Sequence, residues 1–324
     1  MKTAVAIIVP ALNEQATIAD VIRRCREALD ASRFRVTVIA VDDGSTDETA
    51  REAAAAGARV VSHNTNRGVG RAFRTGLEAA LANGAEIIVS IDADGQFDPR
   101  DIPRLIAPIE AGRADFVTAS RFKDPNLIPR MPAAKKWGNR MMSRLISQIT
   151  GTRFHDVSCG FRAYGREAGL RLNLWGDFTY TQETFIDLRI KGMRIEEVPL
   201  AVRGEREHGE SRVASDLVRY AFRTAKIILH SYRDYWPMQF FGGLSLLFMV
   251  PGCLLGVFLL RHRLVAGSFS PHIWAGFTGG ALFGFGLILL VVGLVGEMLK
   301  RIRLNQEMLL YYQRSRDVTH GPDA

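Results

Sequence analysis

Short apolar runs alternate with amphipathic segments over the first 120 residues. Runs rich in Val, Ile and Ala are typical of buried strands, and we expect strands at residues 4–9, 36–41, 59–62, 87–91 and 116–119. Segments with apolar residues at helical spacing separate them, so we expect helices at residues 15–29, 46–56, 69–81 and 100–110. This alternation predicts an α/β fold, with a largely parallel sheet covered by helices on both faces.

The alternation ends after Ser120. A basic loop that contains prolines leads into an expected helix at 137–148, and the polar segment 156–165 follows it. An expected helix at 181–191 and a strand at 194–199 then complete a domain that we assign to residues 1–212. Parallel sheets of this kind bind ligands beyond the carboxyl ends of their strands, so we expect the functional site there.

Two long stretches near the C-terminus carry no charge. Residues 237–260 and 273–296 contain no Asp, Glu, Lys or Arg, and about 20 apolar residues suffice for a helix to cross a bilayer. We therefore predict two transmembrane helices, at about 237–260 and 273–297, within a membrane region of residues 237–298. A hairpin of buried core helices is the alternative, but core helices seldom run so far without a polar face.

The charges around these stretches predict an orientation. Basic residues cluster before the first stretch and after the second, whereas the loop between them has only Arg261 and Arg263. The positive-inside rule then puts the domain 1–212 and a tail at 299–324 on the cytoplasmic side of a plasma membrane or bacterial inner membrane. Residues 213–236 combine apolar and basic positions at helical spacing, which predicts an amphipathic helix in the membrane interface.

The net charge of +8 admits two kinds of anionic partner. A basic patch can bind nucleic acid, but beside two membrane spans the headgroups of anionic lipids are the better partner, and we predict no nucleic-acid binding. Cys25, Cys159 and Cys253 are scattered and no export signal is expected, so we expect reduced thiols. The seven histidines have no zinc-ligand spacing.

Polar motifs follow the expected strands in a fixed order. They are Pro10-Ala11-Leu12-Asn13-Glu14, Asp42-Asp43-Gly44-Ser45-Thr46-Asp47, Asn66-Arg67-Gly68, Asp92-Ala93-Asp94-Gly95-Gln96 and Asp156-Val157-Ser158-Cys159-Gly160-Phe161-Arg162. Most of them, taken alone, are compatible with an ordinary turn or helix cap. Their order and their position at strand ends favour a binding site.

Asp92 and Asp94 are the most informative pair. Alternate residues of an extended chain point to the same side, so the two carboxylates can converge on one divalent cation. Oxygen ligands suit Mg²⁺ or Mn²⁺, which also bridge phosphate oxygens. Two solvated acids in a turn are the alternative, but their position after an apolar strand favours a metal site.

With these motifs the sequence resembles the family 2 glycosyltransferases of GT-A fold, and among them the dolichol-phosphate mannose synthase-like enzymes that glycosylate polyprenyl phosphates. The resemblance covers about residues 4–215. It implies a Rossmann-like catalytic domain, followed by an all-α anchor of two transmembrane helices known among bacterial relatives. By match, the nucleotide sugar, a UDP- or GDP-sugar, would be bound by Pro10, Glu14, Asp43, Gly68 and Asp92. The metal, Mg²⁺ or Mn²⁺, would be bound by Asp92, Asp94 and Gln96, with Asp94 also counted as catalytic.

The resemblance also implies a site for an anionic acceptor. Arg121 and Arg206 match positions that contact phosphates, a task for which guanidinium groups are well suited. Arg130, Lys135 and Lys136 are further candidates, for which an ordinary solvated surface position is the alternative.

Two acids belong to the same implied region. Asp156 matches an acid proposed to assist attack by the acceptor and is our second catalytic candidate, but a phosphate oxygen is already ionised near neutral pH. Base catalysis and simple orientation of the acceptor therefore both stay open for Asp156. Glu183 is a matched acid for which a structural role is equally open.

One departure from related enzymes bears on the product. Processive polysaccharide synthases of the same superfamily carry Gln-x-x-Arg-Trp, whereas this chain reads Gln182-Glu183-Thr184-Phe185. We therefore expect inverting transfer of a single sugar to a polyprenyl phosphate at the cytoplasmic membrane face. Transfer to a glycolipid or saccharide, and a non-catalytic scaffold that binds nucleotide sugar, are the alternatives. Glycines in the spans would permit a homo-oligomer.

Overall fold

The computed structural model describes residues 2–174, 180–203, 229–230 and 232–320. The chain divides into two compact units. One comprises Met1–Ile227 with Leu309–Ala324, and the other comprises Ile228–Met308. Arg206 and residues 213–228 and 231 of the expected amphipathic helix at 213–236 lie outside the described residues.

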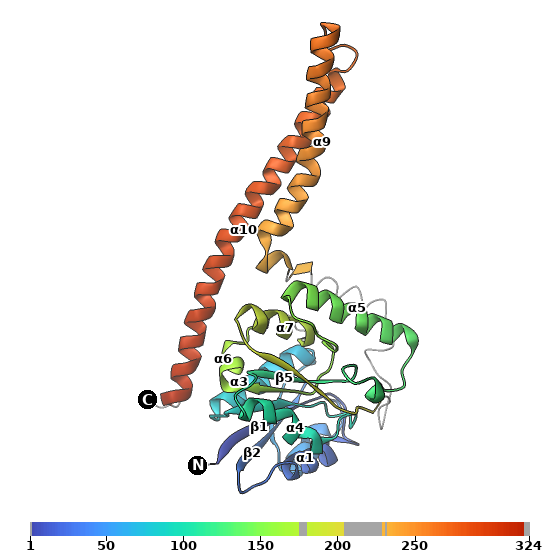
Figure 1. The fold of residues 1–324 in the computed structure, drawn as a ribbon. Coiled ribbons are helices and arrows are strands. Elements are labelled where there is room, and N and C mark those ends of the chain that lie inside the picture. The colour runs from blue at the N-terminus through green and yellow to red at the C-terminus, as the bar shows by residue number, and fades with distance from the viewer. Residues whose placement is uncertain (1, 175–179, 204–228, 231, 321–324) are drawn as a thin grey trace. The chain divides into compact units, whose positions relative to one another are not determined.

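The first unit is built on a 7-stranded sheet of order β3-β2-β1-β4-β6-β5-β7 (Figure 1). Its strands are β1 (Thr3–Ala11), β2 (Phe34–Asp42), β3 (Arg59–Ser62), β4 (Ile87–Ser90), β5 (Phe116–Ser120), β6 (Arg162–Gly165) and β7 (Ile195–Pro199). Among these seven described strands, only β6 runs antiparallel to its neighbours, which are β4 and β5. The α/β class and the largely parallel sheet are thereby confirmed.

Helices cover both faces of this sheet. They are α1 (Ile18–Glu27), α2 (Thr49–Ala55), α3 (Val69–Ala82), α4 (Ile102–Glu110), α5 (Ala133–Thr150), α6 (Arg166–Arg171) and α7 (Thr181–Ile190). Residue Ile7 of β1 belongs to a core that includes Ile22 of α1 and Ile106 of α4. On the opposite face Ile8 lies beneath α3, where Gly76 has no side chain to keep the helix away. Because β1 is buried on both faces, its sequence is almost continuously apolar.

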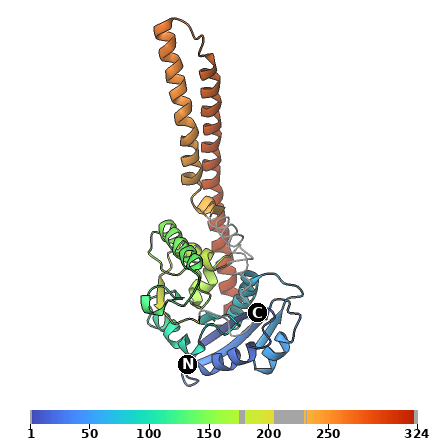
Figure 2. The same ribbon diagram turned by 90° about the vertical axis from the view of Figure 1, so that its right-hand side faces the viewer.

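The second unit contains a hairpin of two apolar helices. They are α9 (Pro237–Ala266) and the part of α10 (Ile273–His320) that reaches Met308, and they run side by side (Figure 2). Both are long and apolar enough to cross a membrane, and only 11% of the most apolar window of each is buried. Such exposure is not typical of the core helices of a soluble protein.

Glycines allow the two helices of this hairpin to approach closely. A Cβ atom added at Gly252 would lie 2.8 Å from the Gly279 carbonyl oxygen, and one added at Gly286 would lie 2.9 Å from the Ser245 carbonyl oxygen. At Gly242, by contrast, an added Cβ meets nothing within 4 Å. Some glycines of the spans therefore serve packing within the chain.

Candidate active site

The turns that follow β1 and β2 are hydrogen-bonded to each other. The Asn13 amide donates to Ser45 Oγ at 2.9 Å, and Asn13 Oδ1 accepts from the Thr46 amide at 2.8 Å. Asn13 has a φ of 53°, a left-handed conformation that asparagine adopts more readily than most residues. The Glu14 amide donates to Thr49 Oγ1 at 2.8 Å. These bonds fix the two turns as one rigid edge of the site.

Asp43 anchors a third segment to this edge. Its carboxylate accepts from the Arg67 amide at 2.9 Å and from the Gly68 amide at 2.8 Å. It also bonds to His63 Nδ1 at 2.7 Å, while His63 Nε2 lies 3.0 Å from Thr75 Oγ1. Asp43 is 4% exposed, so these bonds are shielded from water. The structure thus joins Asp43 and Gly68, and it adds His63, which the sequence motifs did not reveal.

The acidic element follows β4 as a tight turn. The Asp94 carboxylate is 4% exposed and accepts from the Gln96 amide at 3.1 Å, and Gly95 between them has a φ of 72°. The Ala93 carbonyl accepts from Thr17 Oγ1 at 2.7 Å, which ties the turn to the start of α1.

Gly160 lies directly against Asp92. A Cβ atom added at Gly160 would lie 2.8 Å from Asp92 Oδ2, closer than real Cβ contacts allow. The loop formed by residues 156–161 therefore passes over the acidic element, and the absence of a side chain at Gly160 makes this approach possible.

The donor set fits a divalent cation that arrives with a diphosphate. Among the described residues no group of three or more His, Cys, Asp or Glu side chains is arranged to hold a metal by itself. Asp92, Asp94 and Gln96 offer two carboxylates and an amide oxygen. Mg²⁺ is usually held by one or two carboxylates together with phosphate oxygens and water, and Mn²⁺ has similar preferences. Metal binding by these three residues stays a prediction.

Arg121 and Asp156 form a buried ion pair. Arg121 Nε lies 2.6 Å from Asp156 Oδ2 and Nη2 lies 2.9 Å from Oδ1, while the Arg121 amide donates to Oδ2 at 3.1 Å. The Asp156 side chain is 0% exposed and that of Arg121 is 13% exposed. Burial opposes ionisation of Asp156, but the charge and hydrogen bonds of Arg121 outweigh it, so the pKa of Asp156 lies below its ordinary value.

This pairing bears on the role of Asp156. An ionised carboxylate that already binds a guanidinium in bidentate fashion is a weak base, because its affinity for a proton is reduced. The geometry therefore favours orientation of Arg121 over proton transfer. The assignment of Asp156 as a catalytic residue stays a prediction.

Glu197 of β7 holds the chain at Asp156 from the other side. Its carboxylate accepts from the Asp156 amide at 2.8 Å and from the His155 amide at 3.0 Å, and it bonds to His155 Nδ1 at 2.8 Å. Lys123 Nζ donates to the Glu197 carbonyl at 2.6 Å. No motif pointed to Glu197, because its partners lie about 40 residues away along the chain.

The remaining predicted residues have different positions. Gln182 of α7 donates to Ser158 Oγ at 3.3 Å, so the segment with the buried Glu183 borders the loop 156–161. Arg130 is exposed ahead of α5, and Lys135 lies partly buried in its first turn. Arg206 lies outside the described residues, so phosphate binding by Arg206 stays a prediction.

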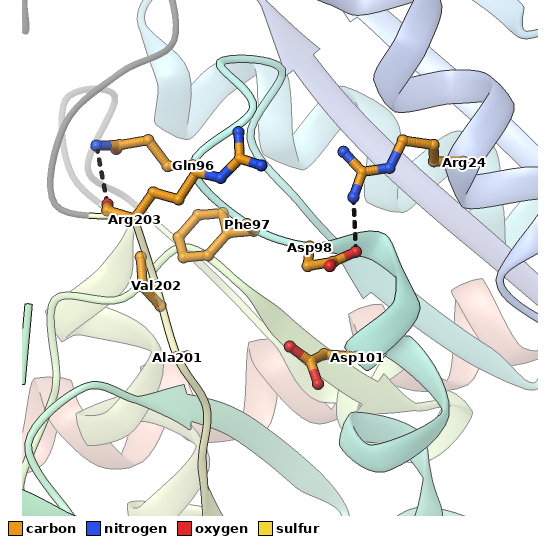
Figure 3. A pocket seen from close by; sticks show the side chains of 8 residues that line it. All are labelled: Arg24, Gln96, Phe97, Asp98, Asp101, Ala201, Val202 and Arg203. Atoms are coloured by element: carbon orange, nitrogen blue, oxygen red, sulfur yellow. Dashed lines mark hydrogen bonds and ion pairs between the residues drawn. The ribbon is translucent and has the colours of Figure 1, made fainter. Parts of the chain in front are cut away.

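A pocket of about 290 Å³ opens beside the acidic element (Figure 3). On one wall the Arg203 amide donates to the Gln96 carbonyl at 3.1 Å, and Gln96 Nε2 donates to the Arg203 carbonyl at 3.5 Å. On another wall Arg24 Nη2 pairs with Asp98 Oδ1 at 2.7 Å. The chain that leaves β7 is thereby tied to Gln96 of the predicted metal element.

Comparison with known proteins agrees with this architecture. Residues 6–169 match the family model for glycosyl transferase family 2. Glycosyltransferase AglJ of Haloferax volcanii is 30% identical in an alignment 312 residues long, which covers 92% of this chain and 97% of that protein. The undecaprenyl-phosphate 4-deoxy-4-formamido-L-arabinose transferase of Pseudomonas paraeruginosa is 30% identical in an alignment 318 residues long, which covers 92% of this chain and 85% of that enzyme.

Solved structures provide a further comparison. Glucosyl-3-phosphoglycerate synthase from Mycobacterium tuberculosis, in complex with Mn²⁺, UDP and phosphoglyceric acid, aligns with a TM-score of 0.57 and 26% identity. The alignment covers 71% of this chain and 78% of that one. The same enzyme in complex with Mg²⁺ and UDP aligns with a TM-score of 0.55 and 25% identity, over 71% of this chain and 79% of that one. The chain therefore belongs to glycosyl transferase family 2 and is a glycosyltransferase of GT-A fold.

Proposed function

We propose that this enzyme transfers one sugar from a UDP- or GDP-sugar to a polyprenyl phosphate at the cytoplasmic face of a membrane. The observation that carries the proposal is that the loop 156–161 contacts both the Arg121 guanidinium and the Asp92 carboxylate. Its Asp156 end holds a cationic guanidinium, and its Gly160 end touches the acidic element. A site for a donor diphosphate and a site for an anionic acceptor would thus lie side by side.

The donor would bind at the acidic element and the turns beside it. Asp92, Asp94 and Gln96 would hold Mg²⁺ or Mn²⁺, and the cation, when bound, neutralises the diphosphate and makes it a better leaving group. Pro10, Glu14 and the turn anchored by Asp43 would bind the nucleotide. These turns are held by hydrogen bonds before any ligand arrives, so little ordering would oppose donor binding.

The acceptor would bind at Arg121, with Arg130, Lys135 and Arg206 as further phosphate ligands. Asp156 binds the Nε and Nη2 edge of the Arg121 guanidinium and fixes its orientation, so a bidentate phosphate would be bound through Nη1 and the second proton of Nη2. An oxygen of the lipid phosphate would attack the anomeric carbon while the bond from that carbon to the nucleoside diphosphate breaks, which inverts the anomeric configuration. The phosphate is largely ionised at pH 7, so this step needs no strong base.

The anchor would keep the enzyme at its lipid substrate. The hairpin of α9 and α10 supports a multi-pass protein of the plasma membrane or bacterial inner membrane. Basic residues lie before the first apolar stretch and after the second. They support a cytoplasmic position for the catalytic domain, residues 1–212, and for both termini. The name of the Pseudomonas relative, an undecaprenyl-phosphate sugar transferase, supports the class of acceptor.

An assay with the purified full-length protein tests the proposal. The protein in detergent is incubated with undecaprenyl phosphate, Mn²⁺ or Mg²⁺ and a panel of radiolabelled UDP- and GDP-sugars. We expect label from at least one donor in an organic-extractable, acid-labile lipid, and none when EDTA is present. If no donor gives such a product, the proposal is wrong. An acid-stable labelled product would instead indicate a glycolipid or saccharide acceptor.

A further inference from the structure

Arg162 is a cation buried directly behind the candidate site. It is 0% exposed, and two nitrogens of its guanidinium donate to backbone carbonyl oxygens. Nε donates to the Cys159 carbonyl at 2.7 Å, and Nη2 donates to the Val157 carbonyl at 3.2 Å. The guanidinium carbon also lies 5.6, 5.5 and 5.2 Å from the ring centroids of Phe116, Tyr180 and Phe185. These contacts offset part of the cost of burying the charge, while Nη1 is buried without a hydrogen-bond partner among the described residues.

The two carbonyls belong to the loop that joins the halves of the proposed site. Val157 and Cys159 lie between Asp156, which holds Arg121, and Gly160, which touches Asp92. Within the loop the Ser158 amide donates to Asp156 Oδ1 at 3.1 Å. A displacement of this short segment would therefore move the guanidinium side and the metal side together.

We propose that Arg162 is a positioning residue that fixes the loop 156–161 against the core. This positioning role rests on the proposed function, since the loop joins the metal side and the guanidinium side of that same site. Arg162 begins β6, whose pairing with β4 and β5 holds its backbone rigidly. A planar guanidinium can donate to two carbonyls at once in a fixed geometry, which a lysine ammonium cannot reproduce. The rigid sheet thereby sets the position of Asp156 and Gly160 through one side chain.

The substitution Arg162→Lys tests this role, because it keeps a cation of similar length and removes the fork of donors. We expect kcat for sugar transfer to fall by about 100-fold, as for a small misplacement of reacting groups. We also expect the affinity for Mn²⁺ in the presence of UDP to fall by about 10- to 100-fold, as for the loss of a residue that orients a metal ligand. Both are measured at a temperature at which circular dichroism shows the variant fully folded.

The variant Ile22→Ala provides a matched control. Ile22 is a fully buried residue of α1 that belongs to the core of the sheet, so its truncation lowers the melting temperature, and its aliphatic side chain donates no hydrogen bond to the loop. We expect this control to keep wild-type kcat and Mn²⁺ affinity below its melting temperature. If Arg162→Lys behaves in the same way, Arg162 is only a stability residue and the proposal is wrong.

Two further measurements keep the test decisive. Mn²⁺ affinity is measured with UDP alone, so it tests the role of Arg162 even if no sugar is transferred to a polyprenyl phosphate. Hydrogen exchange of the wild-type protein covers the case in which Arg162→Lys does not fold. We expect the amides of residues 157–161 to exchange as slowly as those of β5, and exchange as fast as in exposed loops would overturn the proposal.

Discussion

The carboxylate of Asp156 shows how burial and pairing together determine the state of one residue. Burial raises a carboxyl pKa, whereas the adjacent Arg121 charge and the amides of Arg121 and Ser158 lower it, and the lowering prevails. Asp156 is therefore an anion at neutral pH, and it binds the guanidinium of Arg121 through two hydrogen bonds. The same residue type at Asp43 instead binds backbone amides, which shapes a turn.

The state of Asp156 predicts a pH dependence of stability. Its folded pKa lies below the unfolded value of about 3.9, so its contribution is fully present above about pH 5 and is lost as the pH falls through the folded pKa. For Asp156→Asn we expect a loss of about 3–5 kcal/mol at pH 7, because the Arg121 guanidinium, only 13% exposed, is left without its counter-ion. We also expect a shallower loss of stability between pH 5 and pH 2. Chemical unfolding of the wild-type protein and of Asp156→Asn between pH 5 and pH 2 measures the free energy of unfolding. Equal pH slopes for the two proteins would contradict the lowered pKa of Asp156.

At the scale of elements, the loop before β6 determines how closely the two sides of the site approach. Gly160 leaves no room for a side chain beside Asp92, since an added Cβ would lie 2.8 Å from a carboxylate oxygen. Gly165, at the other end of β6, has more space around it. A Cβ added at Gly165 would lie 3.4 Å from the nearest atoms, the Asp115 carbonyl oxygen and a methyl carbon of Ile109.

These two glycines form a matched pair of variants. We expect Gly160→Ala to displace the Asp92 carboxylate and to weaken Mn²⁺ binding in the presence of UDP by about 10-fold or more. Gly165→Ala requires a smaller adjustment of its surroundings, and we expect its Mn²⁺ affinity to stay within about 2-fold of wild type. Isothermal titration measures both affinities. Equal affinities for the two variants would show that the contact at Gly160 does not affect the metal site.

The strength of the local signal explains which elements were predictable. Strands β1, β2 and β4 were predicted because buried parallel strands are continuously apolar. Strand β6 was missed, since its sequence Arg162-Ala163-Tyr164-Gly165 has no alternation, and the strand forms because it pairs with β4 and β5. Helix α1 begins at Ile18 and not at Gln15, because Gln15 belongs to the turn that bonds to Asp47.

The residues of the candidate site also divide into those that the sequence motifs revealed and those that they did not. Acidic and glycine-rich motifs at strand ends were recognisable, because each is compact in sequence. His63 and Glu197 were not recognisable, because each gains its role from partners that lie 20 and 41 residues away in the chain. Buried hydrogen bonds between distant segments leave no periodic or spaced pattern in a single sequence.

At the scale of the whole molecule, the chain combines a folded catalytic unit with a separate apolar hairpin. The hairpin packs through glycines, of which Gly252 and Gly279 bring the backbones of α9 and α10 into contact. Close packing of this kind is a principal source of stability between helices in lipid, where the hydrophobic effect does not drive their association.

The hairpin contact predicts unequal effects for two glycines of α9. A side chain at Gly252 would collide with Gly279 and Phe283, whereas an added Cβ at Gly256 meets nothing within 4 Å. We expect Gly252→Leu to lower the melting temperature of the purified protein in detergent by several degrees and Gly256→Leu to leave it nearly unchanged. Equal melting temperatures for the two variants would argue against this hairpin packing.

The orientation in the membrane is open to a labelling experiment. We expect a cysteine introduced as Val265→Cys, in the exposed last turn of α9, to react with a membrane-impermeant maleimide in intact cells. A cysteine introduced as Thr46→Cys, in the catalytic unit, should react only after the cells are opened. The background variant Cys253→Ala removes the exposed native thiol, since Cys25 and Cys159 are buried. The reverse pattern of labelling would place the catalytic unit on the outer side.

The covalent structure of the reaction product is the most direct test of inverting sugar transfer to a polyprenyl phosphate. The lipid formed from undecaprenyl phosphate and the accepted nucleotide sugar is extracted and analysed by ¹H and ³¹P NMR. We expect one phosphodiester that joins the anomeric carbon to the polyprenyl chain, with the anomeric configuration inverted relative to the donor. A product with retained configuration, or with a sugar linked through a hydroxyl and no phosphodiester, would contradict it.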